Sequence, residues 1–161
     1  MPPLIRDRAI TSDDWVYGDT PDPAGAAKRV LPLAEYLAVA ASGAAGPGLA
    51  VMLKPEEHDL AALQPHLPKL PLVVIHFPAA GDGRGFSQAK LLRERYGYKG
   101  ELRAHGRVQV DQIWFMARCG FDAFDLAAGE DAQLAIAQLE RFTVAYQDGA
   151  EKLVHPRRRA P

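Results

Sequence analysis

Apolar and polar positions follow a repeating order along the second part of the chain. Four apolar runs of strand length are each followed by a stretch in which apolar residues recur at helical spacing. The runs cover residues 49–53, 70–77, 102–104 and 123–126. Strands that alternate with helices in this way are typical of parallel βαβ units with right-handed crossovers. We therefore predict an α/β fold with about four consecutive β-α units.

The helices of these units end at proline or glycine. Pro65 limits the first helix, because proline breaks a helix interior, and Gly97 and Gly149 follow the second and the last. The third helix is apolar nearly all round, so we expect it to be largely enclosed. The predicted helices span residues 56–64, 86–96, 108–118 and 132–146.

The first third of the chain is mixed in its pattern. Two short strands are predicted around a turn, and after a loop a third strand leads into a short helix. A run of small residues then forms a hinge, which is the best candidate for an internal boundary. In order, these are strand 4–10, turn 11–14, strand 15–17, loop 18–25, strand 29–32, helix 33–41 and hinge 41–48.

These elements predict a single α/β domain over residues 1–150. Residues 1–48 supply the N-terminal strands and the hinge, residues 49–150 form the repeat region, and residues 151–161 form a basic, disordered tail. Two architectures fit: an open sheet, or a half barrel whose edge is capped by the N-terminal strands or by a second copy of the chain. A half barrel leaves strand edges open, which favours a homo-oligomer.

Composition narrows the class of protein. The 161 residues fit one domain, and 19 Lys and Arg against 20 Asp and Glu give a net charge of −1. That balance argues against nucleic-acid or anionic-membrane binding, which need a strong positive field. No apolar run reaches the roughly 20 residues that span a bilayer. With charges close to the N-terminus and a single cysteine, Cys119, we expect a cytoplasmic protein.

Parallel strands place their following loops on one rim, and this rim carries the most unusual residues. Glycines 81, 83 and 85 can present backbone N–H groups at a helix start, so the turn can hold an oxyanion or a carboxylate. The spacing matches neither nucleotide fingerprint. An equally open interpretation is structural, with turn and helix-cap roles. The candidate ligand-binding residues are Asp82, Gly83, Arg84, Gly85, Ser87 and Gln112.

Asp111 is the best candidate for a catalytic residue. It lies in the first turn of an apolar helix, where a carboxylate either meets a cation, such as Arg84 or Arg107, or works as an acid or base. His105 and Asp125 also belong to the rim, but a lone loop histidine is more often a surface group, and His76 fits a core residue. We predict no metal site, and the sequence identifies no cofactor.

The stretch DGRGFSQA at 82–89, its continuation LLRERYGYKGELRA at 91–104, Asp111-Gln112 and CGFDAF at 119–124 carry a family likeness. The chain resembles the bacterial domain-of-unknown-function family number nine hundred thirty-four. Its genes commonly lie beside those for assimilatory sulfite reductase and phosphoadenylylsulfate reductase, and its members are sometimes labelled probable oxidoreductases. Arg107 and Val110 depart from the family pattern, so the resemblance implies no role for a charge at either position.

The resemblance implies an accessory protein, or an oxidoreductase component, of assimilatory sulfite reduction that binds a small oxyanion or the reductase itself. A second hypothesis is an enzyme in its own right, with Asp111 as general acid or base and Arg84 holding an anionic substrate. A third is a scaffold module that assembles with a copy of itself or another subunit and binds no small ligand.

Overall fold

A computed structural model describes residues 3–18 and 28–141 of the chain. Within these residues, eight strands form one sheet in the order β2-β1-β8-β7-β6-β5-β4-β3. Strands β3 to β8 are parallel, and β1 runs antiparallel to both β8 and β2. The strands are β1 Leu4–Arg6, β2 Ala9–Thr11, β3 Val16–Tyr17, β4 Arg29–Pro32, β5 Leu49–Leu53, β6 Leu72–Phe77, β7 Glu101–Gly106 and β8 Ala123–Asp125.

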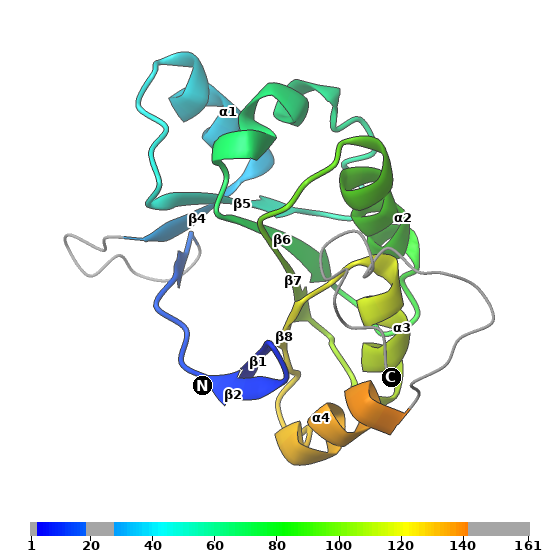
Figure 1. Cartoon of the computed structure of the whole chain (residues 1–161). Helices are drawn as coiled ribbons and strands as arrows, with labels where there is room; N and C mark the ends of the chain where they lie inside the picture. Colours follow the sequence, from blue (N-terminus) through cyan, green and yellow to red (C-terminus); the bar gives the residue numbers. More distant parts are fainter. Residues whose placement is uncertain (1–2, 19–27, 142–161) are drawn as a thin grey trace.

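The sheet curls into a half barrel, and the helices lie around the outside of the curl (Figure 1). Strands and helices alternate along the chain from β4 onward, so the predicted α/β class with mostly parallel strands is confirmed. The helical elements are α1 Leu33–Ala41, the 3-10 helix η1 Ala61–Lys69, α2 Arg84–Lys90, the π-turn η2 Leu91–Arg95, the 3-10 turn η3 Val110–Gln112, α3 Ile113–Cys119 and α4 Ala132–Arg141.

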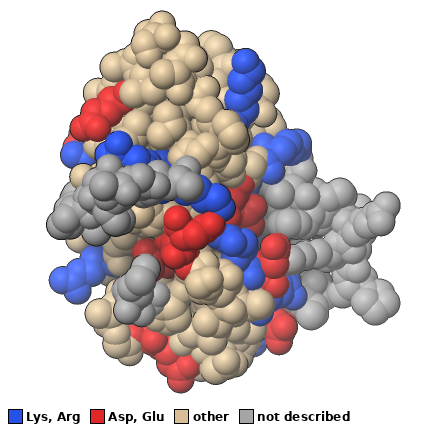
Figure 2. All heavy atoms as spheres, turned by 90° about the vertical axis from the view of Figure 1, so that its left-hand side faces the viewer, with Lys and Arg blue, Asp and Glu red and all other residues tan. Residues whose placement is uncertain are grey.

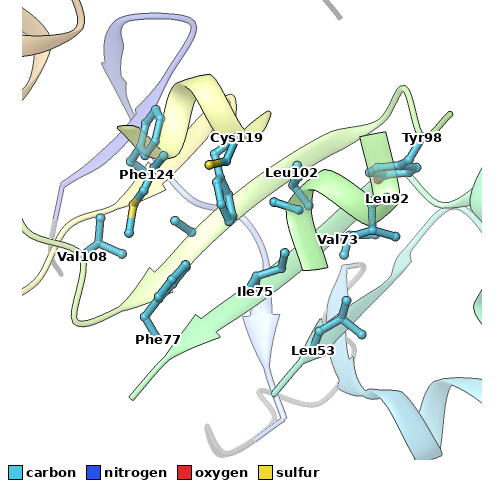
Figure 3. Packing of buried hydrophobic residues seen from close by; sticks show 14 of the residues in the cluster. Leu53, Val73, Ile75, Phe77, Leu92, Tyr98, Leu102, Val108, Cys119 and Phe124 are labelled. Carbon is cyan, nitrogen blue, oxygen red and sulfur yellow. The ribbon is translucent and has the colours of Figure 1, made fainter. Parts of the chain in front are cut away.

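The central strand β6 is buried on both faces. Leu72, Val73, Val74 and Ile75 are each at most 1% exposed, as expected for a parallel strand covered on both sides. Val73 and Ile75 belong to the main core between the sheet and the helices, part of which Figure 3 shows. Leu72 and Val74 face a smaller apolar cluster, which includes Trp15, inside the curl.

The N-terminal strands form both edges of the sheet. The predicted strand 4–10 is a hairpin, in which Asp7 and Arg8 take positive φ values of 51° and 62° between β1 and β2. Such a two-residue turn matches the twist of paired strands. Strand β3 forms the other edge beside β4, and the half barrel is therefore bounded at both ends by the first third of the chain. Strands β4 and β5 pair across the predicted hinge.

Three predicted helices differ in the structure. The second, predicted over 86–96, begins at Arg84 and is divided into α2 and η2. The first begins later and includes Pro65, because a 3-10 helix uses the φ that proline imposes and does not depend on a long α-helical ladder. The third is divided into η3 and α3, and Phe115 is 48% exposed rather than enclosed. Only the face of α3 with Ile113, Met116 and Cys119 enters the core. Residues 142–161, which include the end of the last predicted helix and the basic tail, lie outside the described residues.

A buried guanidinium joins the outer layer to the start of β8. Arg93 is 1% exposed, and its Nε and Nη1 donate to the backbone carbonyls of Gly120, Tyr98 and Gly100 at 2.8–2.9 Å. Its Nη2 lies 3.0 Å from Asp122 Oδ2. Burial raises the pKa of the Asp122 carboxyl to about 6, against the lowering effect of Arg93.

Replacing Arg93 with methionine should lower the free energy of unfolding by about 3–5 kcal/mol, because the Asp122 carboxylate and three carbonyls would lose a buried partner. Urea unfolding followed by circular dichroism measures the change. Arg95→Met is the matched control, since Arg95 is exposed and should change stability by less than about 0.5 kcal/mol. Equal losses in the two variants would contradict this role of Arg93.

Candidate functional site

Polar side chains gather inside the curl at the carboxyl ends of neighbouring parallel strands. His76 of β6 pairs in register with His105 of β7, and their ring centroids are 5.6 Å apart. Ala104 pairs with Phe124, so the next residue of each strand brings His105 level with Asp125. Side chains alternate between faces along a strand, which puts these three residues on the face opposite the main core. Three strands thus contribute to one site.

The closest contact in this site joins His105 to Asp125. The imidazole Nδ1 lies 2.6 Å from Asp125 Oδ2, and the two side chains are 27% and 16% exposed. An ionised carboxylate can only accept a hydrogen bond, so Nδ1 donates and Nε2 is left for another partner. A histidine oriented by a carboxylate can act as an acid, a base or a ligand-binding group.

Tyr17 covers one face of the His105 ring. The two rings are stacked, with centroids 4.6 Å apart and an angle of 17° between their planes. Tyr17 belongs to β3, an edge strand that lies far from β7 in the sheet order, and only the curl of the sheet brings the two together. Burial raises the pKa of the Tyr17 phenol above its ordinary value, which keeps the hydroxyl neutral at physiological pH.

Beneath this stack, the fully buried Arg103 links the site to the N-terminal segment. Its Nη1 donates to Asp13 Oδ2 at 2.7 Å and to the Tyr17 hydroxyl at 3.0 Å. Its Nε and Nη2 donate to Glu101 Oε1 at 2.9 and 2.7 Å, and Glu101 Oε2 lies 2.8 Å from Arg6 Nε. Burial opposes the charge of Arg103, but Tyr17, Glu101 and Asp13 outweigh it and raise its pKa.

Charged side chains of both signs gather in the middle of the face shown in Figure 2, which is the side of the molecule that lies on the left of Figure 1.

The contacts of Arg103 give it a positioning role in the site. Because the guanidinium is 0% exposed and is already bonded to two carboxylates and a phenol, it holds neighbours in place instead of receiving a ligand.

The predicted glycine-rich turn is built around a local ion pair. Asp82 accepts hydrogen bonds from Arg84 Nε at 2.9 Å and Arg84 Nη2 at 2.6 Å, and the backbone N–H of Arg84 donates to the same carboxylate. These bonds lower the pKa of Asp82 to about 2. Arg84 therefore pairs with Asp82, and Ser87 is exposed beyond the start of α2. Whether the turn binds a ligand stays a prediction.

The other two predicted residues lie on η3, after β7. The Nε2 of Gln112 donates to the carbonyl of Ala80 at 2.6 Å, which ties the loop after β6 to the loop after β7. Asp111 is exposed, and among the described residues no hydrogen bond or ion pair joins it to Arg84 or Arg107. The structure therefore pairs Asp82 with Arg84 and bonds Gln112 to the carbonyl of Ala80. Asp111 takes part in neither contact.

Gly85 has a packing role that the sequence did not reveal. A Cβ at this position would lie 2.6 Å from the Phe77 ring and 2.9 Å from Ile75, since α2 packs directly on β6 here. Gly81, in the preceding loop, has nothing within 4 Å of such an atom. Close packing on the core thus requires glycine at position 85 but not at position 81.

Replacing Gly85 with alanine should lower the free energy of unfolding by about 1–3 kcal/mol through overpacking against Phe77. Gly81→Ala is the control, and it should leave stability unchanged or raise it by up to about 1 kcal/mol, because alanine restricts the unfolded chain. Thermal and urea unfolding of both variants measure the effect. A Gly85→Ala protein as stable as the wild type would show that α2 does not pack on β6 as described.

Only part of this site follows from the sequence. The pattern predicts His105 and Asp125 on the rim, but it favours a surface role for His105 and a core role for His76. Tyr17 and Arg103 are not among the predicted site residues. The available signal was the spacing of Arg103 and His105, two residues apart on one strand, which puts both on one face. Nothing comparable in the sequence indicated that Tyr17 meets them.

Residues 3–18 and 28–141 contain neither a cluster of metal-ligating side chains nor a helix that could span a membrane. No group of three or more His, Cys, Asp and Glu side chains in this part of the chain is arranged to hold a metal ion. None of its helices has both the length and the apolar character needed to cross a bilayer.

The fold and the site define a half-barrel α/β protein whose polar residues gather inside the curl of the sheet. The chain belongs to the family described as "Bacterial protein of unknown function (DUF934)", whose model matches residues 50–155. Nothing among curated proteins or among solved structures matches it. The family match covers β5 from Ala50 onward and the whole of β6, β7 and β8, and so includes His76, His105 and Asp125.

Proposed function

We propose that this protein is a cytoplasmic accessory protein of assimilatory sulfite reduction that binds a small oxyanion beside His105 and exchanges a proton with it. The observation that carries the binding and proton-exchange part is the 2.6 Å contact between His105 Nδ1 and Asp125 Oδ2. The pathway is supported by the family resemblance alone. The reductase, or another enzyme of sulfur assimilation, is the expected partner.

The chemistry of the His105 site suits an oxyanion that carries a proton part of the time. When Asp125 holds the Nδ1 proton, the imidazole Nε2 can donate to a bound anion in the protonated state and accept its proton in the neutral state. Histidine commonly exchanges protons with bound groups in this way. His76, 5.6 Å away, supplies a second imidazole at the same strand ends.

His105 is better supported in this role than Asp111. A proton-transferring group works best when its orientation is held by a neighbour, and His105 has both Asp125 and Tyr17 for this purpose. Asp111 is exposed and carries no such contact among the described residues. A stand-alone enzyme with Asp111 as its acid or base therefore has less geometric support.

Anion binding can be tested by titrating the protein, with 15N-labelled histidine, with sulfite, sulfate and phosphate. Saturable shifts of the His105 Nε2 resonance are expected in the wild type. His105→Gln should weaken binding at least about tenfold, because a hydrogen bond to a charged group is lost. His66→Gln is the control, since His66 packs against Tyr36 in a different ring pair and should leave binding unchanged. No shift with any of the three anions at millimolar concentration would remove the anion from the proposal.

The accessory role can be tested in extracts of a strain that lacks the gene. Sulfite reduction should fall in these extracts, and purified wild-type protein or His66→Gln should restore it. His105→Gln should fail to restore it although it folds. Full sulfite reduction without the protein would exclude the role. Restoration by His105→Gln would instead show that the accessory role does not need the histidine.

A further inference from the structure

We infer that Tyr17 is a positioning residue of the His105 site, supplied by the N-terminal segment to hold the imidazole with Nε2 directed to the ligand. The existence of a ligand rests on the proposed function, whereas the orientation of the imidazole is argued from contacts within the protein alone. Tyr17 lies on the edge strand β3, which four strands separate from β8, and outside the stretch that the family model matches.

Two contacts of different kinds determine the orientation of the His105 ring. The Asp125 carboxylate holds one edge of the ring through Nδ1, at 2.6 Å. A single hydrogen bond still allows the ring to turn about the bond axis. Tyr17 stacks on its face at 4.6 Å with the planes only 17° apart, which restricts that rotation. Together the two contacts leave Nε2 as the ring nitrogen available to a ligand.

Tyr17 is in turn held by side chains as well as by its strand. Strand β3 has two residues, and it pairs with β4 only through Val16 and Tyr17. The Tyr17 hydroxyl accepts a hydrogen bond from Arg103 Nη1 at 3.0 Å, and the same nitrogen donates to Asp13. Asp13 also accepts from the backbone N–H of Trp15 at 3.2 Å, which holds the approach to β3.

The route from Arg103 to His105 is therefore short. Arg103 and His105 lie two residues apart on one face of β7, and Tyr17 bridges them with its hydroxyl on the first and its ring on the second. The charged or titratable groups that face this arrangement are His76 from β6, Asp125 from β8, and Asp13 and Glu101 around Arg103. The buried ion cluster thus supports the Tyr17 ring together with the pairing of β3 and β4, and the ring in turn restricts the imidazole.

Variants of Tyr17 separate the ring from the hydroxyl. Tyr17→Phe keeps the stack and loses the bond to Arg103, whereas Tyr17→Leu loses both. Tyr36→Leu is the matched control, because Tyr36 makes a ring contact with His66 in another part of the protein. If Tyr17→Leu does not fold, Tyr17→Met replaces it, since methionine fills space adaptably without stacking as an aromatic ring does.

The first measurement needs no ligand. The Nδ1 proton of His105 should give a resolved downfield NMR resonance in the wild type, in Tyr17→Phe and in Tyr36→Leu, because the bond to Asp125 protects it. In Tyr17→Leu or Tyr17→Met it should exchange faster with water and broaden beyond detection. An unchanged resonance in the variant without the aromatic ring would overturn the inference.

The second measurement is the affinity for sulfite as a probe. Loss of the Tyr17 ring should weaken binding by roughly twofold to tenfold, the range expected for one aromatic pair, and Tyr17→Phe should restore most of it. If the wild type binds no anion while the Nδ1 resonance still depends on Tyr17, the proposed ligand is wrong and the positioning role stands. Equal affinity in the wild type and Tyr17→Leu would overturn the link between position and binding.

Discussion

The contact between the buried guanidinium of Arg103 and the N-terminal segment determines which side chains meet inside the half barrel. Arg103 is held from its own strand by Glu101 and from across the curl by Asp13 and Tyr17. An arginine without partners at this depth would be strongly unfavourable, so the charge requires that these groups converge on it. Their convergence places an aromatic ring over His105.

The two faces of the sheet are used for different purposes. Outside the curl, Leu102 and Ala104 of β7 pack with the helices in the main core. Inside, Arg103 and His105 of the same strand are polar and bonded to neighbours. Because side chains alternate between the two faces of a strand, the apolar residues of β7 pack in the core and its polar residues face the site. The helices can therefore cover the outer face of the sheet without closing the site.

The glycine-rich turn illustrates how a motif with the composition of an anion site can serve the fold. Asp82 closes the turn by bonding to Arg84, and Gly85 lets α2 approach β6 closely. Both features satisfy local requirements of backbone and packing. The carboxyl ends of β6, β7 and β8 instead collect imidazole and carboxylate groups that face one another, as the candidate functional site.

Much of the architecture followed from local pattern. Strand 29–32, helix 33–41 and strand 49–53 were predicted with the bounds that they have, because apolar runs and helical spacing report directly on burial. The same pattern put His105 and Asp125 on one rim, since parallel strands share their direction. The start of η1 and the division of the third helix could not be placed this way, as both depend on packing around proline and on which face meets the core.

Only the tertiary structure shows that Tyr17 contacts His105. The contact depends on the N-terminal segment reaching β7, where Asp13 bonds to Arg103. These two residues are 90 positions apart in the chain, and no periodicity links them. The meeting arises because the sheet curls until an edge strand reaches the inside face of β7. Curl accumulates from the small twist between neighbouring strands over the whole sheet. Local sequence patterns specify each strand, whereas the distance between two strands far apart in the sheet depends on all those between them.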